Sequence, residues 1–179
     1  MKTRYILTTR LKTRDAVAAT AAYTLRHDMG YQDVLTDVTR EDYWCIDLDP
    51  AELPEDTTAV MKELAEKTRV FVNPNKHSYC VRPEGAIRSA SCPGHPDTFS
   101  IPVIIGCFED RTGMTALETL KNLYPVGRKV RSVQSGVLWT LTIRADTIEA
   151  ARQIAENMTL TRSRTEGLLA NPHSDSTLI

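Results

Sequence analysis

The sequence predicts an α+β protein made of two repeated modules, each with the element order β-α-β-β-α(-β). Three kinds of marker occur twice, in the same order and at nearly the same spacing. They are a strand-like opening segment, a tryptophan and an Asn-Pro step, found at 4–7, Trp44 and Asn73-Pro74 and again at 102–105, Trp139 and Asn171-Pro172. The separations are similar (103 − 5 = 98, 139 − 44 = 95, 172 − 74 = 98).

Each module is expected to form a small antiparallel sheet with both helices on one face. The bare face is a liability, because a module of this size buries too little apolar surface alone. Two modules that pack their sheet faces together would solve this problem, so we expect a pseudo-twofold arrangement within the chain and self-association between chains. The predicted modules are 1–82 and 99–179, with a Pro-, Gly- and Ser-rich linker at 83–98.

In the first module, alternating residues predict strands, and apolar residues repeated every four positions predict helices. Gly30 stands where a left-handed helix cap is needed, and the polar segment 39–42 is read as a turn between two strands. The predicted elements are strands at 5–11, 34–38, 43–48 and 76–82 and helices at 15–29 and 56–67.

The second module repeats this order, with strands at 103–108, 129–133, 137–143 and 173–179. Its first helix carries Thr115 and Glu118 at capping-box spacing near its start, and Pro125 ends it. Its second helix begins at Asp146, which we expect to be the cap. The segment 134–136 is read as the turn of a hairpin.

The composition excludes several classes of function. The formal net charge is −1, so no global field attracts nucleic acid or an anionic membrane. The longest aliphatic run, at 103–105, is far too short to cross a bilayer, and no signal-peptide hydrophobic region follows the N-terminus. We therefore expect a cytoplasmic protein whose 4 cysteines are reduced thiols.

The closing motif Leu168-Leu169-Ala170-Asn171-Pro172 resembles the end of the PurS small subunit of phosphoribosylformylglycinamidine synthase. A weaker version, 70–74, ends the first module. The element order of both halves also fits that family, and a tandem pair is similar to the PurS-like N-terminal domain of the single-chain synthase.

The resemblance implies a non-catalytic assembly role in purine biosynthesis. The parent complex is an ATP- and glutamine-dependent amidoligase, in which a large synthetase subunit and a glutaminase carry out the chemistry. The small subunit bridges them, so that ammonia passes without loss to bulk water. The resemblance therefore implies these two subunits as partners, no cofactor and no activity for the chain alone.

Two other functions compete with this one. The same element order is typical of tandem modules that sense an amino acid or a nucleotide between their halves. A separate enzyme is the third alternative, although the sequence carries no Gly-rich phosphate loop, no paired-histidine metal motif and no recognisable nucleophile motif.

The repeated markers have structural interpretations. Asn73-Pro74 and Asn171-Pro172 are read first as turns, because proline favours extended geometry before it and Asn tolerates a left-handed turn. Trp44 and Trp139 are read as core residues, with an interface anchor as the alternative.

Two further groups are candidates for binding. His77-x-x-Cys80 and Cys92-x-x-His95 could form a tetrahedral zinc site, although residues three apart on a strand point to opposite faces. Arg128, Lys129 and Arg131 are a local basic excess; the default interpretation is a solvated face, and a patch for an anion or an acidic partner is the alternative.

Overall fold

The computed structural model describes residues 3–53, 56–163 and 167–179. Within these ranges the protein is α+β, as predicted, with seven strands in one sheet and four α-helices. The strands are β1 (Arg4–Leu11), β2 (Leu35–Leu48), β3 (His77–Pro83), β4 (Ala90–Cys92), β5 (His95–Cys107), β6 (Val130–Arg144) and β7 (Asp175–Leu178). The helices are α1 (Ala16–Tyr23), continued by a π-helical turn (Thr24–Asp28), α2 (Thr57–Lys67), α3 (Arg111–Leu123) and α4 (Ile148–Thr159), with 3-10 turns at Pro50–Glu52 and Pro125–Lys129.

The strands follow the hydrogen-bonded order β3-β1-β2-β6-β5-β4, and β7 also pairs with β5. β1 is antiparallel to β2 and β3, with Leu7 opposite both Trp44 and Val81. β5 is antiparallel to β4 and β7. The expected pair of separate sheets packed face to face is therefore wrong, because β2 and β6 are neighbours that join the strands of both halves in one sheet.

Each predicted central hairpin is instead one long strand. β2 runs through the polar segment 39–42, and β6 runs through 134–136. The apolar residues on either side of these segments belong to different hydrophobic cores. The polar residues therefore mark the place where a strand leaves one core and enters the other, which sequence periodicity alone cannot tell from a turn.

The predicted linker also contains structure. Within 83–98, β4 and the start of β5 form a hairpin in which Cys92 pairs with His95. Gly94 has φ 79°, so the turn uses a backbone conformation that favours glycine. The Pro and Gly content of this segment thus reflects a tight turn.

Two helix starts differ from the prediction. α3 begins earlier than the Thr115 and Glu118 pair suggested, because the Asp110 carboxylate accepts a hydrogen bond from the Gly113 amide at 2.7 Å. α4 is capped by Thr147, whose hydroxyl accepts from the Ala150 amide at 3.1 Å, rather than by Asp146. The predicted end of α3 before Pro125 and the left-handed Gly30 (φ 80°) are confirmed.

The chain forms two compact units, and each takes segments from both halves of the sequence. The predicted boundaries 1–82, 83–98 and 99–179 therefore do not coincide with the units. Unit 1 contains Met1–Thr13, Glu41–Ala86 and Glu109–Gly136, and unit 2 contains Arg14–Arg40, Ile87–Phe108 and Val137–Ile179.

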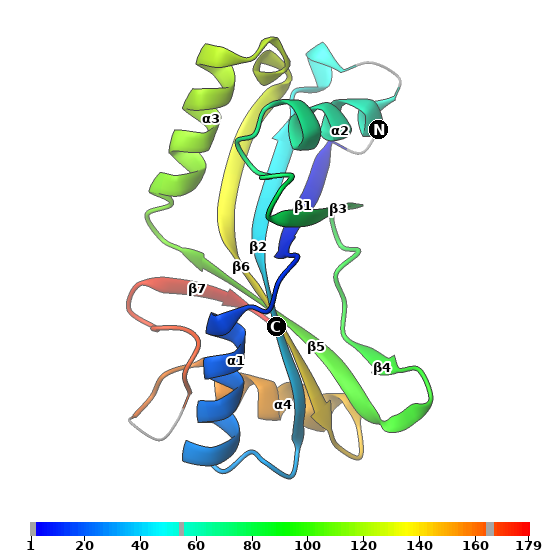
Figure 1. The fold of residues 1–179 in the computed structure, drawn as a ribbon, viewed down its shortest axis with the longest axis vertical. Helices are drawn as coiled ribbons and strands as arrows, with labels where there is room; N and C mark the ends of the chain where they lie inside the picture. The colour runs from blue at the N-terminus through cyan, green and yellow to red at the C-terminus, as the bar shows by residue number, and fades with distance from the viewer. Residues whose placement is uncertain (1–2, 54–55, 164–166) are drawn as a thin grey trace. The chain divides into compact units, whose positions relative to one another are not determined.

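Unit 1 has its own core, built by α2 and α3 on β1 and parts of β2 and β6 (Figure 1). Its fully buried side chains include Leu7, Met61, Leu64 and Leu120. The close packing of such residues supplies most of the stability of a small unit.

Unit 2 has a second core, built by α1 and α4 on β5 and the other parts of β2 and β6 (Figure 1). Ile101, Leu141 and Met158 are fully buried there, as is Leu25 from the π-helical turn. The first helix of each half therefore belongs to the opposite unit from the second helix of the same half.

The segments that the halves exchange stand at corresponding positions. Arg14–Arg40 lies in unit 2, and Glu109–Gly136 lies in unit 1. Both start just before a helix, and their starts are separated by the interval between the tryptophans (109 − 14 = 95). Each unit thus combines one helix–strand segment from one half with the remaining elements of the other.

We predict that Met61→Ala lowers the free energy of unfolding by about 3 kcal/mol, because Met61 is fully buried in the unit 1 core and truncation leaves a cavity. Lys62→Ala, at the next position and exposed, is the control and should change stability by less than about 0.5 kcal/mol. Urea unfolding measures both; equal effects would contradict this assignment of the core.

Candidate functional site

The two Asn-Pro steps form the same turn. The Asn73 carbonyl accepts from the Lys76 and His77 amides at 3.0 and 2.8 Å, and its Oδ1 accepts from Asn75 at 3.0 Å. At the second step, the Asn171 carbonyl and Oδ1 accept from the residues at the same relative positions (2.9–3.2 Å). Each turn leads into the last strand of its half, β3 or β7.

The amide of each Asn is also held by the side chain four residues later. The Asn73 amide donates to His77 Nδ1 at 3.4 Å, and the Asn171 amide donates to Asp175 Oδ2 at 2.8 Å. Pro74 and Pro172 are exposed. All these bonds are local, as a structural role requires.

The leucine pair before Asn171 has two environments. Ala170 is buried, Leu169 is half-buried, and Leu168 is exposed. The backbone here is tied to the end of α4, since the Leu168 amide donates to the Met158 carbonyl at 2.9 Å. Leu168 and Leu169 therefore present apolar surface beside α4.

The two tryptophans are placed in different units. Trp139 is buried in the unit 2 core, whereas Trp44 is half-buried at the margin of the unit 1 core. The Trp44 ring meets Phe71 edge-on at a centroid distance of 5.0 Å. Among the described residues, the buried Trp44 Nε1 has no hydrogen-bond partner.

Each tryptophan lines an open cavity beside the first helix of the opposite half. The unit 1 cavity, about 550 Å³, is lined by Trp44, Thr68, Arg69, Val70, Arg111, Thr112, Thr115, Ala116, Thr119 and Tyr124. The unit 2 cavity, about 460 Å³, is lined by Ala16, Val17, Thr20, Ala21, Thr24, Trp139, Leu168 and Leu169.

The two cavities use corresponding positions of the sequence. The helix residues of the unit 2 cavity, shifted by the tryptophan interval, are the helix residues of the unit 1 cavity (111 − 16 = 95, 119 − 24 = 95). Each cavity is also lined by residues that come after the second helix of a half. These residues are 68–70 in unit 1 and 168–169 in unit 2. The cavities are therefore counterparts, although their side chains differ.

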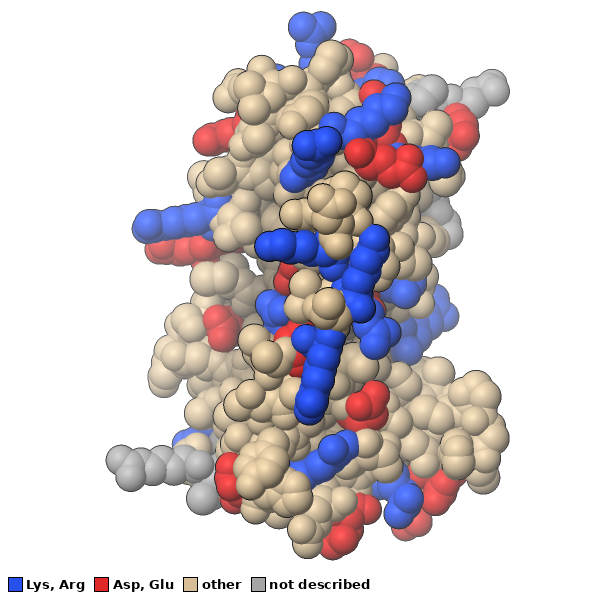
Figure 2. Space-filling view, viewed as in Figure 1, with Lys and Arg blue, Asp and Glu red and all other residues tan. Residues whose placement is uncertain are grey.

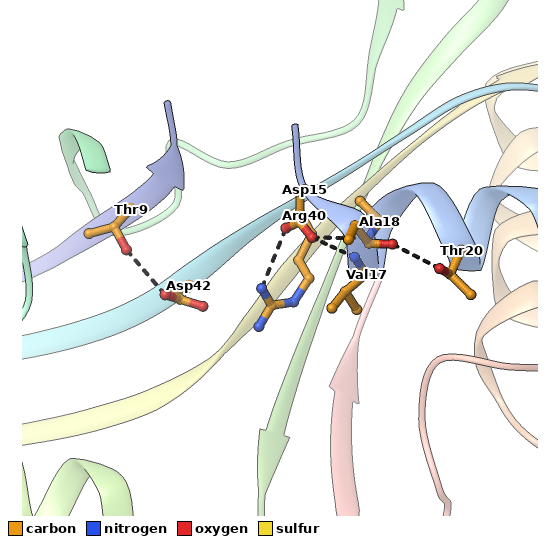
Figure 3. A network of polar contacts seen from close by, with 8 residues as sticks. Thr9, Asp15, Val17, Ala18, Thr20, Arg40 and Asp42 are labelled. Atoms are coloured by element: carbon orange, nitrogen blue, oxygen red, sulfur yellow. Dashed lines mark hydrogen bonds and ion pairs between the residues drawn. The ribbon is translucent and has the colours of Figure 1, made fainter. Parts of the chain in front are cut away.

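The helix beside each cavity is fixed by an aspartate. In unit 2, the Asp15 carboxylate accepts from the Val17 and Ala18 amides at 2.8 and 3.1 Å and pairs with Arg40 at 3.5 Å (Figure 3). In unit 1, Asp110 at the corresponding position caps α3 and binds the Ser135 amide and hydroxyl. Each cap thus ties its helix to the middle of a long strand.

Arg69, at the edge of the unit 1 cavity, has φ 55°, a left-handed conformation that is costly for a residue with a Cβ. The corresponding residue of the second half is Gly167, with φ 73° (167 − 69 = 98). Sequence reasoning missed Arg69, but aligning the two halves would have placed an arginine opposite a glycine.

The proposed zinc ligands lie on two antiparallel pairs of strands, β1 with β3 and β4 with β5. His77 and Cys80 are on β3, opposite Leu11 and Thr8 of β1, and their spacing puts them on opposite faces. Cys92 and His95 face each other across the β4–β5 turn. Over residues 3–53, 56–163 and 167–179, no group of three or more His, Cys, Asp or Glu side chains is arranged to hold a metal ion.

The basic excess lies on a 3-10 turn and the start of β6. Arg128 and Arg131 are exposed, and Lys129 is half-buried, with its carbonyl accepting from the Asp49 amide at 2.9 Å. Figure 2 shows Lys and Arg side chains interspersed with acidic ones on the face in view. The geometry of these three residues fits a solvated surface as well as it fits a patch for an anion.

A group of titratable side chains lies on the sheet face of unit 1 away from its helices, where Tyr43 and Cys45 alternate with the core residues of β2. Burial raises the pKa of the Tyr43 phenol and of the Cys45 thiol. A thiol with a raised pKa stays protonated near neutral pH, so Cys45 is a poor nucleophile. Arg4 lies nearby, bonded to Glu84 at 3.1 Å.

Comparison with protein-family models, with curated proteins and with solved structures gives no match for this chain. In the part of the chain that the structure describes, no helix combines the length and the apolar character needed to span a membrane.

Arg69→Gly should raise the free energy of unfolding by about 1 kcal/mol, because glycine adopts the left-handed conformation without steric cost. Gly167→Ala should have the opposite sign and cost more than about 2 kcal/mol, because its Cβ would lie 1.7 Å from the Leu160 carbonyl oxygen. Thermal and urea unfolding check both; destabilisation by Arg69→Gly would contradict the backbone assignment.

Alkaline pH should destabilise the protein. Folding raises the pKa of Tyr43 and Cys45 above their ordinary values of 10.0 and 9.0, so the unfolded chain loses these protons first. The stability that the neutral groups contribute is present below pH 9 and is lost as pH rises above it. In urea unfolding between pH 8 and 11, Tyr43→Phe should lose stability less steeply, and an unchanged slope would contradict this origin.

Proposed function

We propose that this chain contains two PurS-like modules in a pseudo-twofold arrangement and is a non-catalytic assembly subunit. Its partners would be the synthetase and glutaminase of a phosphoribosylformylglycinamidine synthase complex. The observation that carries the proposal is the exchange of Arg14–Arg40 and Glu109–Gly136 between the units, at corresponding positions of the two halves. This exchange is what a duplicated module with internal symmetry would produce.

The local details support the same proposal. The closing motif on which the resemblance rests leads into an Asn-Pro turn whose hydrogen bonds recur at Asn73 and Asn171. Both second helices also end in the same way, since Thr68 and Thr159 are buried and donate to carbonyls four residues back at 2.6 and 2.7 Å. Related sequences folded twice would give such pairs.

The surface supports an interaction role. α3 exposes Met114 and Leu123 on either side of its buried stripe, with 63% and 69% of their surfaces accessible. In unit 2, α1 exposes Val17 and Tyr23. Large apolar side chains that are exposed on a helix favour contact with another protein. β3 and β4 end the path of strands and offer edges to a partner.

Bridging would place the chain where ammonia must pass from one enzyme to the other. This function needs shaped surfaces rather than reactive groups, because sequestering an intermediate depends on excluding water. Self-association would extend such a bridge, and we propose it together with the assembly role.

The test is whether the purified chain co-elutes with the synthetase and the glutaminase. Glutamine, an ATP analogue and the ribonucleotide substrate are present during the elution. We expect one complex, and we expect Leu123→Glu to weaken it at least about tenfold, because a charge would replace a buried apolar contact. Asn122→Glu, at an exposed neighbouring position of α3, is the control. A chain that elutes alone under these conditions would overturn the proposal.

The alternative is a module that senses an amino acid or a nucleotide. The counterpart cavities of units 1 and 2 favour it, because each is lined by residues from both halves of the sequence, as a site between two halves would be. A rise of several degrees in the unfolding temperature with one metabolite, in the absence of any partner protein, would support the sensor.

A further inference from the structure

The two counterpart cavities differ in chemistry at the same positions. Arg111 and Thr112 of the unit 1 cavity correspond to Ala16 and Val17 of the unit 2 cavity. The residue with a left-handed backbone that comes after the second helix of each half is Arg69 in the first half and Gly167 in the second. The unit 1 cavity is thus lined by two cationic side chains and four threonines, whereas its counterpart is apolar apart from two threonines.

We propose that the unit 1 cavity binds a small planar aromatic anion, with its ring against Trp44 and its carboxylate or phosphate group between Arg69 and Arg111. This site does not rest on the assembly role proposed above. The ligand class of the unit 1 cavity is an aromatic anion, and the unit 2 cavity serves as an internal control.

Arg69 is available for an anion. Its side chain is exposed, and it makes no hydrogen bond or ion pair with any other residue that the structure describes. Arg69 has a left-handed backbone, which is strained for a residue with a Cβ. Gly167 adopts the same kind of backbone without strain. Costly conformations of this kind concentrate at binding sites, where the side chain is needed at that point of the backbone.

Arg111 can also turn to a ligand. It pairs with Glu109 at 3.5 Å, but both side chains are more than four-fifths exposed, so water screens this pair. No aspartate or glutamate is among the residues that line the cavity. Two arginines that line a cavity without carboxylates favour a bound anion.

The aromatic part of the ligand is indicated by Trp44. The indole lines the cavity and is half-buried, and Phe71 contacts it edge-on. An aromatic ring in the cavity would extend this pair by stacking or edge contact. Thr112 and Thr115 line the same cavity on successive turns of α3 and supply hydroxyl groups for the anionic end.

The indole N–H signals of Trp44 and Trp139 provide a separate readout for each cavity. They are resolved in one nitrogen–proton correlation spectrum and assigned with Trp44→Phe and Trp139→Phe. Phenyl phosphate and benzoate are the probes, with phenol as the neutral ring and inorganic phosphate as the anion without a ring. We expect the aromatic anions to shift the Trp44 signal in a saturable way and to leave the Trp139 signal in place.

Arg69→Gly is the decisive variant, because it removes the guanidinium and keeps the backbone. We expect this variant to bind the aromatic anion with the higher affinity, phenyl phosphate or benzoate, at least about tenfold more weakly, while its unfolding temperature rises. Phenol and inorganic phosphate should each bind at least about tenfold more weakly than that anion. Arg128→Ala, an exposed arginine outside the cavity, is the control and should leave binding unchanged.

Three results would overturn the proposal. They are no saturable shift of the Trp44 signal with either anion, equal shifts of both indole signals, and unchanged affinity in Arg69→Gly. These measurements use the chain alone, so failure to assemble with the synthetase and glutaminase would not affect them. Comparing phenyl phosphate with benzoate shows whether the site prefers a phosphate or a carboxylate.

Discussion

The structure depends on two long strands that each serve two cores. β2 packs Leu35 and Val38 in the core of unit 2 and Ile46 and Leu48 in the core of unit 1. β6 does the same with its two ends. Because backbone hydrogen bonding continues through the polar middle of each strand, the helix–strand segments before these midpoints join the opposite unit. The exchange and the paired cavities follow from this constraint.

The exchange determines which side chains meet in each cavity. In unit 1, Trp44 and the end of α2 come from one half, and α3 comes from the other. Each cavity therefore combines side chains from both halves of the sequence. Arg69 and Gly167 stand 98 positions apart (167 − 69 = 98), after the second helix of each half, and both have a left-handed backbone. One chain thus carries two cavities at corresponding positions of the sequence, with different lining side chains.

Much of the fold could be predicted from the sequence, because local patterns encode it. The periodicity of α2, the stop at Pro125 and the cap at Gly30 are local signals. The central strands could not be predicted, since a polar segment such as 134–136 has the composition of a turn even where the chain stays extended. The candidate site could be predicted only in part: Trp44 stood out by its repetition, whereas Arg69 and Arg111 come together through the exchange between halves.

Native-state hydrogen exchange on Leu25→Ala tests the exchange of segments most directly. Leu25 belongs to the first half of the sequence but is fully buried in the core of unit 2. We expect the amides of β5 and α4 to lose the most protection, while those of β1 and α2 keep theirs. A loss centred on β1 and α2 would mean that each half folds as its own module, and it would contradict this account.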